Sequence, residues 1–365
     1  MRILFAGGNG YTPEFSGGVQ SSTDHLVRQC IAAGHEAGVF AALFGGGLFG
    51  LRARARMKLS RRRATRDNHP GYPVVRAWFP AEEAAFAVRE IRPNVAVVQC
   101  QKSVPIGLAL QREGVPLVVY FRNVEFAELE GDPRDLDALF VANSRFTAER
   151  YAQAFGIDCT VIPPTIDPAK YRADGSRDRV TFINVYPEKG FERAVALARA
   201  CPDIPFLFLE GWLLDDAHLA RVEAELAPLP NVTFERRTND MRAVYARTRI
   251  LLAPSRWEEA WGRVASEAHC SGIPVLGSTR GGLPEAIGPG GVALDHDAPL
   301  EDWTAALRAM WDDEERYALL SRAAAEWSAR PELDPARQFE TFMDVLERAA
   351  SGGAKGVTPL PLSAA

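Results

Sequence analysis

The feature that most constrains the fold is an alternation of short apolar runs with longer amphipathic stretches along most of the chain. In the first half the apolar runs are "RILFAG", "EAGVFAAL", "YPVVRAW", "NVAVVQ", "PLVVYFR" and "ALFVAN". Runs of this kind are typical of strands buried on both faces, and the amphipathic stretches between them are typical of helices that cover a parallel sheet. The sequence therefore predicts an α/β fold, with its first helix from about Val19 to Ala33.

A proline-rich stretch at residues 162–178, "IPPTIDPAKYRADGSRD", divides this alternation. Strand-like runs restart after it, with "RVTFINV", "PFLFLEG", "NVTFER", "RILLAPS", "IPVLGS" and "GVALD". We predict two Rossmann-like parallel-sheet domains, at residues 1–165 and 166–334. A last helix at about 335–350 is expected to pack back on the first domain, and a Gly/Pro/Ser-rich tail at 351–365 is expected to be disordered.

Composition and charge exclude several classes of protein. A formal net charge of -5 gives no global positive field for nucleic acid, and no nucleic-acid-binding motif is present. The five cysteines are scattered without CxxC or Cys/His spacing, so we expect reduced thiols and no metal site. The chain opens with a strand-like run rather than a basic leader, and no apolar run reaches the roughly 18 residues of a membrane span. We expect a cytoplasmic protein.

Two carboxylates stand eight positions apart in "EEAWGRVASE", residues 258–267, at a connection between a strand and a helix. A helix that starts near Gly262 offers free N–H groups and a positive dipole end, which suit a phosphate. Glu267 is placed to accept hydroxyl hydrogens from a vicinal diol such as a ribose, and Glu259 can face a different group. The alternative is that Glu259 is a solvated loop residue and Glu267 a first-turn acid stabilised by the dipole.

The longer stretch "PSRWEEAWGRVASEAHCSGIPVLGSTRGGLPEAI" resembles the donor-site signature of the retaining GT-B glycosyltransferases of family four. In that signature E-x7-E is followed by a small-residue helix, "G-x-P-V" and "GG-x-x-E". The resemblance extends to "FSGGVQSSTDHLVRQCIAAGHE", "YPEKGFERAVALA" and "VANSRFTAERYAQAFG", and is weakest at residues 44–70 and in the tail. It implies a GT-B fold, in which an N-terminal acceptor-binding domain and a C-terminal donor-binding domain face each other across a cleft.

The resemblance also implies individual roles. Glu267 would hold the nucleotide ribose, Glu259 would contact the transferred sugar, and Lys189 of "EKG" would bind the donor diphosphate. Gly17 and Gly18 would let backbone amides approach the phosphates. The alternative for the lysine and the glycines is a plain turn. The further donor contacts that we predict are Asn184, Arg256, Ala260, Trp261, Gly262 and Arg263.

Two positions depart from the family pattern. The family has an Arg five residues before the lysine, where this chain has Asn184, and Arg256 or Arg263 could replace that cation or be a surface arginine. The family also has a His near the end of the strand "VVYFR", where Arg122 and Asn123 stand here. A strand-end Arg can cap the sheet, but polar residues at this edge of an open α/β sheet are typical of ligand sites. The catalytic candidates are Glu259, Lys189, Arg122 and Asn123.

A basic run between the second and third of these strands has no acidic residue among its members, which are Arg52, Arg54, Arg56, Lys58, Arg61, Arg62, Arg63 and Arg66. It is either a solvated helix or mobile loop, or a patch that meets an anionic acceptor or an acidic bilayer surface. The second alternative would place the protein peripherally on the inner membrane face. It would also favour an anionic or lipid-linked acceptor.

Three further residues have predicted structural roles. Ser144 is expected to cap the helix that follows it, and His269 is expected to be a packed core residue. Glu285 of "GGLPE" is either a ligand contact or a helix cap.

The resulting hypothesis is a retaining glycosyltransferase that moves a sugar from a nucleotide-diphosphate sugar to the hydroxyl of a glycan, glycolipid or small molecule, without a metal or other cofactor. A sugar-nucleotide 2-epimerase would need a histidine and carboxylate constellation that the sequence does not contain. A noncatalytic nucleotide-sugar binder is the other alternative, because this chain lacks the family Arg before the lysine and the family His near the end of the strand "VVYFR". A dinucleotide-binding fingerprint is rejected, because Pro13 replaces its third glycine.

Overall fold

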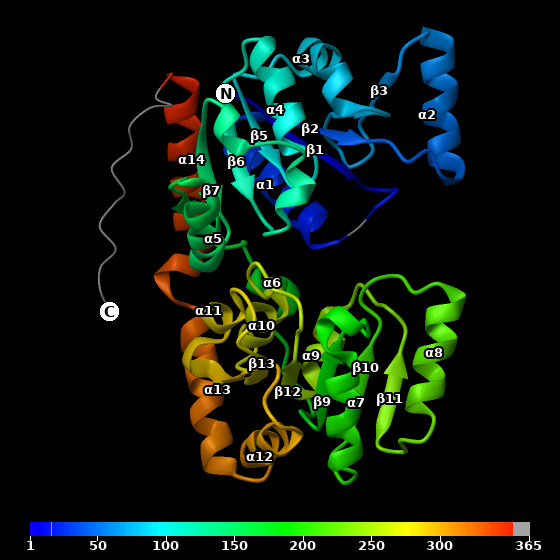
Figure 1. Ribbon diagram of the computed structural model, residues 1–365, viewed down its shortest axis with the longest axis vertical. Helices are drawn as coiled ribbons and strands as arrows, with labels where there is room; N and C mark the ends of the chain where they lie inside the picture. The colour runs from blue at the N-terminus through cyan, green and yellow to red at the C-terminus, as the bar shows by residue number, and fades with distance from the viewer. Residues whose placement is uncertain (16, 353–365) are drawn as a thin grey trace. The chain divides into compact units, whose positions relative to one another are not determined.

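The computed structural model describes residues 1–15 and 17–352, and it divides the chain into two compact units. One unit comprises Met1–Pro163 with the segment that starts at Ala336, and the other comprises Pro164–Pro335. The predicted α/β architecture with two parallel-sheet domains is confirmed (Figure 1). The predicted tail lies outside the described residues, except for Ser351 and Gly352.

The first unit is built on an eight-stranded sheet with the order β3-β4-β2-β1-β5-β6-β7-β8. Its neighbouring strands are parallel, except that β3 pairs with β4 in antiparallel fashion. The strands are β1 (Arg2–Gly10), β2 (Glu36–Ala42), β3 (Ala64–Asp67), β4 (Val74–Ala77), β5 (Val95–Gln99), β6 (Leu117–Phe121), β7 (Ala138–Ala142) and β8 (Thr160–Val161). The helices are α1 (Gly18–Ala32), α2 (Gly47–Ser60), α3 (Ala84–Ile91), α4 (Ser103–Arg112), α5 (Arg145–Phe155) and α14 (Pro335–Ala350), with 3-10 turns η1 (Pro80–Glu83), η2 (Phe126–Leu129) and η3 (Pro133–Asp135).

Alternate residues of each strand of this sheet bury opposite faces. In β1, Leu4 and Ala6 join a core under α3, α4 and α5, whereas Ile3 and Phe5 join a core under α1 and α14. Helix α14 comes from the far end of the chain, and its Phe342 stacks on Phe5 with ring centroids 6.1 Å apart. Because both faces are covered, the strands read as unbroken apolar runs, which is why they can be predicted from sequence.

The second unit is built on a six-stranded sheet with the order β11-β10-β9-β12-β13-β14, in which all pairs are parallel. The strands are β9 (Arg179–Ile183), β10 (Phe206–Leu209), β11 (Val232–Glu235), β12 (Thr248–Ala253), β13 (Val275–Ser278) and β14 (Gly291–Leu294). The helices are α6 (Pro168–Tyr171), α7 (Phe191–Ala200), α8 (Asp216–Leu226), α9 (Met241–Arg247), α10 (Arg263–His269), α11 (Leu283–Ile287), α12 (Leu300–Trp311) and α13 (Glu314–Ser328), with 3-10 turns η4 (Pro187–Lys189), η5 (Gly288–Gly290) and η6 (Pro331–Leu333).

Two strands were not predicted. Strand β3 has four residues, two of them charged, and pairs only with β4 at the sheet edge. Strand β8 has two residues. The basic run, for which helix and loop were both open, forms helix α2 up to Ser60. All five cysteines are free, as expected. Across the described part of the chain, no helix combines the length and the apolar character needed to cross a bilayer.

Candidate active site

An ion pair between Lys189 and Glu259 forms the centre of the candidate site. Lys189 ends the turn η4 that follows β9, and Glu259 lies in the loop that follows β12. The distance from Lys189 Nζ to Glu259 Oε1 is 2.6 Å, and Ser255 Oγ donates a hydrogen bond to the same oxygen at 2.9 Å. The two charged side chains are only 18% and 20% exposed. Since β9 and β12 are parallel neighbours, both loops lie at the carboxyl edge of the sheet, where open α/β sheets bind ligands.

Glycines bring these loops into close contact. Gly190 has φ of 87°, and a Cβ there would lie 2.0 Å from the carbonyl oxygen of Pro254. Gly281 has φ of 68° and forms a bridge with Glu259, so that a Cβ would lie 2.3 Å from the Glu259 carbonyl oxygen. The backbone of the Glu259 loop is therefore fixed on both sides by residues that must lack a side chain.

Glu267 is held in a separate polar cluster inside helix α10, where it is 8% exposed. Tyr245 donates a hydrogen bond from its hydroxyl to Glu267 Oε2 at 3.0 Å, and Arg263 Nη2 donates to Oε1 at 3.3 Å. Arg263 Nη2 also lies 3.4 Å from the hydroxyl oxygen of Tyr171. Burial raises the pKa of the Glu267 carboxyl above its usual value, although the nearby Arg263 charge and the hydrogen bonds oppose this effect.

Ala260, Trp261 and Gly262 follow Glu259 directly and lead into α10. The indole of Trp261 is 2% exposed and donates its N–H to Ser266 Oγ at 3.0 Å, so any ligand contact of Trp261 must come from its main chain. Gly262 caps α10 with φ of 96°, and a Cβ there would lie 2.5 Å from Leu283 Cδ1. Its lack of a side chain thus has a packing reason independent of any ligand. Ala260 is half-buried in the same loop.

Arg256 and Arg263 differ as replacements for the missing family cation. Arg263 is engaged with Glu267, as described above. Arg256 is exposed, and among the described residues its side chain makes no hydrogen bond or ion pair. Of these two arginines, Arg256 is therefore the one that remains available to a ligand.

Asn184, at the position of the family Arg, has a backbone role. It follows β9 in the left-handed region with φ of 77°, a conformation that Asn adopts more readily than Arg. Its side-chain Oδ1 accepts a hydrogen bond from the N–H of Trp212 at 3.2 Å. The Lys189 ammonium lies over the Trp212 ring, 5.1 Å from its centroid. Asn184 thus positions the aromatic ring that packs against Lys189.

Arg122 and Asn123 lie in the first unit, directly after β6. Arg122 stacks over the Tyr120 ring at 4.3 Å, and its Nη1 lies 3.4 Å from the Val19 carbonyl oxygen and 3.5 Å from Thr23 Oγ1. Its Nε and Nη2 atoms are buried and, within residues 1–15 and 17–352, have no hydrogen-bond partner. Asn123 has a different environment, because its Nδ2 donates to a Glu128 carboxylate oxygen at 2.7 Å.

The contact with Val19 brings Arg122 to the first turn of α1. Gly18 is the first residue of that helix and Gly17 its N-cap, with an extended backbone and no side-chain cap. The structure therefore brings together a guanidinium with two nitrogen atoms that have no partner among the described residues and the start of a 15-residue helix that has no side-chain cap, and both features favour an anion.

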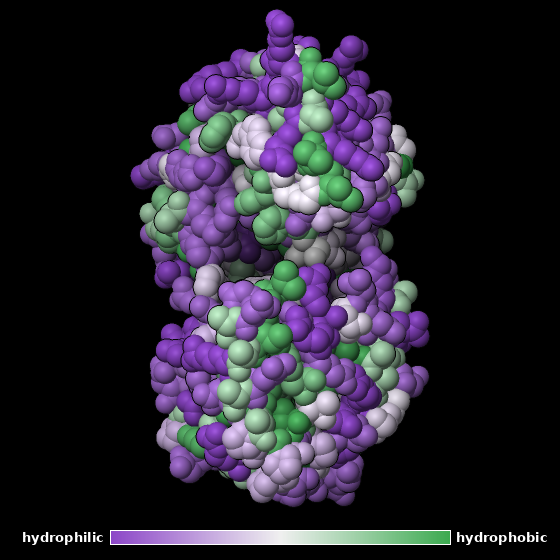
Figure 2. All heavy atoms as spheres, turned by 90° about the vertical axis from the view of Figure 1, so that its right-hand side faces the viewer, coloured by the Kyte–Doolittle hydropathy of each residue, from purple (hydrophilic) through white to green (hydrophobic). Residues whose placement is uncertain are grey.

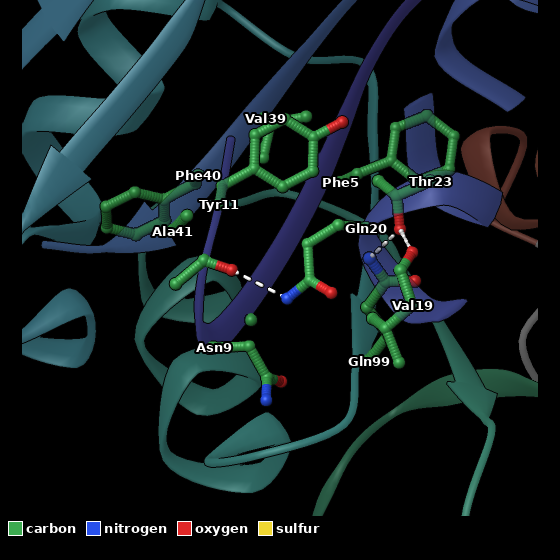
Figure 3. Close-up of a pocket in the computed structure, with 12 residues that line it drawn as sticks. Phe5, Asn9, Tyr11, Val19, Gln20, Thr23, Val39, Phe40, Ala41 and Gln99 are labelled. Carbon is green, nitrogen blue, oxygen red and sulfur yellow. Dashed lines mark hydrogen bonds between the residues drawn. The ribbon is translucent and has the colours of Figure 1, made fainter. Parts of the chain in front are cut away.

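A small cavity lies beside α1, lined by Gly10, Gln20, Thr23 and Gln99 among others (Figure 3). The amide nitrogen of Gln20 donates to the Gly10 carbonyl oxygen at 2.8 Å, and that of Gln99 donates to Thr23 Oγ1 at 2.8 Å. With a volume of about 20 Å³ the cavity accommodates one water molecule rather than a sugar. It is therefore part of the packing beneath α1.

Two of the three structural predictions are confirmed. Ser144 is the N-cap of α5, since its Oγ accepts a hydrogen bond from the Thr147 N–H at 2.9 Å. His269 is 1% exposed, and burial lowers its pKa to about 4. The capping role considered for Glu285 would require its carboxylate to accept a hydrogen bond from the N–H of Gly282, the N-cap of α11. In the structure that N–H donates to the Glu259 carbonyl oxygen instead.

Around Lys189, Glu259, Arg263 and Glu267, four contacting residues were missed: Ser255, Tyr245, Tyr171 and Trp212. Only Ser255 had a local signal, because it ends the run "RILLAPS" at the edge where ligands bind. The others come from helices and loops whose sequence distance from the motif hides the contact.

Two family models match consecutive parts of the chain. The model described as "Glycosyltransferase Family 4" matches residues 16–170, and the model described as "Glycosyl transferases group 1" matches residues 170–327. The fold and site define a class of two-domain α/β proteins with a lysine and two carboxylates at the edge of the second sheet. More specifically, the chain belongs to the group 1 glycosyltransferases of family 4.

Named relatives and solved structures agree with this family. A D-inositol 3-phosphate glycosyltransferase of Segniliparus rotundus is 28% identical over 61% of this chain and 59% of its own length. A GDP-mannose-dependent alpha-(1-6)-phosphatidylinositol monomannoside mannosyltransferase of Mycolicibacterium smegmatis is 26% identical over 51% of this chain and 56% of its own. The chain thus spans less than two thirds of these curated relatives.

The fold similarity covers nearly the whole chain. The structure of Anabaena Alr3699/HepE in complex with UDP and glucose matches with a TM-score of 0.75 at 18% identity, covering 95% of this chain and 99% of that one. At this identity the match concerns the fold.

Proposed function

We propose that this protein is a retaining glycosyltransferase that moves a sugar from a nucleotide-diphosphate sugar to a hydroxyl acceptor. The observation that carries the proposal is the Lys189–Glu259 ion pair of 2.6 Å at the carboxyl edge of the second sheet, with Glu267 buried on the next helix. A cation and two acids so placed can bind a diphosphate, a sugar hydroxyl and a ribose diol. The UDP and glucose bound by the HepE neighbour support a donor of this class.

The proposed reaction uses front-face substitution and needs no metal. The bond between the anomeric carbon and the diphosphate oxygen breaks, the acceptor oxygen bonds to the same face, and the leaving phosphate takes the acceptor proton. Lys189 stabilises the charge that develops on the diphosphate, and Glu259 orients the sugar. In the free protein these two side chains neutralise each other, so donor binding must provide new partners for both.

The acceptor is proposed to carry an anionic group, such as a phosphate. Arg122 supports this, since two of its buried nitrogen atoms lack a partner in the described residues and a buried unpaired donor is costly. The inositol 3-phosphate and phosphatidylinositol monomannoside named for the two relatives are acceptors of this chemistry. The first unit would then bind the acceptor, and the second the donor.

A thermal-shift panel of UDP, GDP, ADP and TDP sugars tests the donor proposal, because a ligand that binds the folded state raises the melting temperature. We expect the nucleotide sugar of one base to raise the melting temperature of the wild-type protein. A Lys189→Met variant should lose most of that rise. NMR of the product anomer then tests retention of configuration. No shift with any nucleotide sugar would refute the donor site.

Two alternatives are separated by product analysis. Conversion of the donor sugar without an acceptor would indicate a 2-epimerase. Donor binding without turnover in a lysate that contains natural acceptors would indicate a noncatalytic binder. The proposal also places the protein in the cytoplasm, where nucleotide sugars are made.

A further inference from the structure

Helix α2 has two opposite apolar faces, and the residues that the structure describes cover only one of them. Successive residues are about 100° apart around a helix. Gly50, Ala53 and Met57 are buried on the face that packs against the first unit. On the opposite face Leu48, Leu51 and Leu59 are 76%, 54% and 86% exposed.

The three leucines form a stripe rather than scattered surface positions. Leu48, Leu51 and Leu59 are separated by three and eight residues, which brings them within about 80° of one another around the helix axis. Ala55 lies between them and is also exposed. Phe44, just before the helix, is 54% exposed and extends the apolar surface at its start.

Basic side chains flank this stripe on both sides. The same angular arithmetic places Arg52 and Arg56 on one flank and Arg54 and Lys58 on the other. All four are exposed, and among the residues that the structure describes none of them forms an ion pair or hydrogen bond through its side chain. No acidic residue occurs from 44 to 66.

The structure separates these four residues from the remainder of the basic run. Arg63 pairs with Glu82 at 3.0 Å, Arg66 pairs with Glu90 at 3.4 Å, and Arg62 stacks on a phenylalanine ring. Within residues 1–15 and 17–352, the cations of the basic run that have no side-chain partner are therefore the four beside the leucine stripe and Arg61, which follows the helix. Figure 2 shows apolar side chains in green among hydrophilic ones in purple on the side of the molecule where α2 lies.

We propose that α2 docks the protein on an anionic lipid bilayer, with the helix axis in the plane of the surface. The leucine stripe would enter the boundary between headgroups and acyl chains, and the flanking cations would meet lipid phosphates. The apolar stripe argues against nucleic acid, because a phosphate backbone would contact the cations but leave the leucines in water. The inference concerns a helix that carries none of the proposed donor or catalytic residues, and it holds whether or not the proposed transfer is correct.

The test is co-sedimentation of the full-length protein with phosphatidylcholine vesicles, with and without phosphatidylglycerol. We expect binding only when phosphatidylglycerol is present, and weaker binding at high salt. Each basic residue near the surface contributes roughly fivefold to the partition coefficient, so neutralising four should lower it by two orders of magnitude or more. This charge variant is R52Q/R54Q/R56Q/K58Q.

A matched control changes the net charge equally at exposed positions elsewhere. Its members make no side-chain ion pair or hydrogen bond in the described part of the chain, and they are R112Q/K170Q/R221Q/R322Q. A second pair isolates the apolar contribution at constant charge. L48Q/L51Q/L59Q should reduce binding about tenfold or more, whereas Leu319→Gln, 61% exposed in the other unit, should not.

Because every substituted side chain is exposed, the variants should keep the wild-type melting temperature. Equal binding to both vesicle types would overturn the proposal, as would an equal loss in the charge variant and its control. Unchanged binding of the leucine variant would reduce the contact to electrostatics and overturn the docking geometry. A complete absence of vesicle binding would overturn the proposal as well.

Discussion

The buried carboxylate of Glu267 allows a quantitative test of the donor site. Its two oxygens offer about four acceptor positions, of which Tyr245 and Arg263 occupy one each. The Tyr171 hydroxyl also hydrogen-bonds this carboxylate, so about one position remains, and a vicinal diol that takes two must displace Tyr171. Hydrogen bonds to a charged group contribute about 1.5 to 3 kcal/mol, against about 0.5 to 1.5 for neutral ones. Replacing Glu267 with Gln should therefore cost about 1 to 3 kcal/mol of nucleotide binding, or roughly a tenfold to hundredfold rise in Kd.

Isothermal titration with the nucleoside diphosphate that the thermal-shift panel identifies measures this change. The matched control is Glu259→Gln, which we expect to weaken binding of the complete nucleotide sugar but to leave the diphosphate nearly unaffected. Glu267→Gln should retain the fold, because the amide avoids the desolvation that raises the pKa of the acid. An unchanged Kd in Glu267→Gln would refute the ribose assignment.

The pH dependence gives a second measurement on the same residue. Burial raises the pKa of Glu267, so the carboxylate becomes protonated at a higher pH than an exposed Glu, whose pKa is about 4.3. Only the ionised form accepts two diol hydrogens without competition. The wild-type Kd should therefore rise as the pH falls through this raised pKa, whereas the Gln variant should lack that rise. Identical pH profiles would contradict the role.

Other perturbations test the remaining assignments. Lys189→Met should lower kcat about 100- to 1,000-fold, as measured with saturating donor, because one charge that stabilises the leaving diphosphate is lost. Arg122→Gln should raise the Kd for inorganic phosphate or a phosphorylated acceptor about tenfold to hundredfold while leaving nucleotide affinity unchanged, and loss of both would instead indicate a donor contact. Burial lowers the pKa of His269 from 6.5 to about 4, so the unfolded state binds a proton first as the pH falls. Between these two pH values the free energy of unfolding of the wild type should fall by about 3 kcal/mol. Urea titrations should show a much smaller fall for His269→Asn. Gly190→Ala should destabilise the protein by clearly more than about 1 kcal/mol, the typical cost of backbone strain at positive φ alone. The control is Gly34→Ala, which should show only that strain, because Gly34 has φ of 82° and nothing within 4 Å of a Cβ.

Much of the fold is encoded locally. Strands buried on both faces are apolar throughout, so that β1, β6 and β12 stand out as runs in the sequence. Helix starts carry their own signals, as Ser144 does for α5. Strand β3 carries no such signal, because an edge strand with charged residues resembles a loop.

The candidate site was predictable only in part. The spacing of Glu259 and Glu267 and the "EKG" motif identified three of its charged groups. Their partners could not be predicted from the sequence, because Tyr245 reaches Glu267 and Trp212 reaches Lys189 through tertiary contacts. The sequence also left open whether residues 47–60 form a helix. It therefore did not predict that Leu48 and Leu59 share one face of a helix.

The alternation of strands and helices and the proline-rich boundary could be predicted from the sequence, because both depend on neighbouring residues along the chain. The contact of Lys189 with Glu259 and the approach of Arg122 to the start of α1 became visible only in the folded protein. These contacts join residues far apart in sequence. They exist because parallel strands bring their carboxyl ends to one edge, a geometry that no local pattern contains.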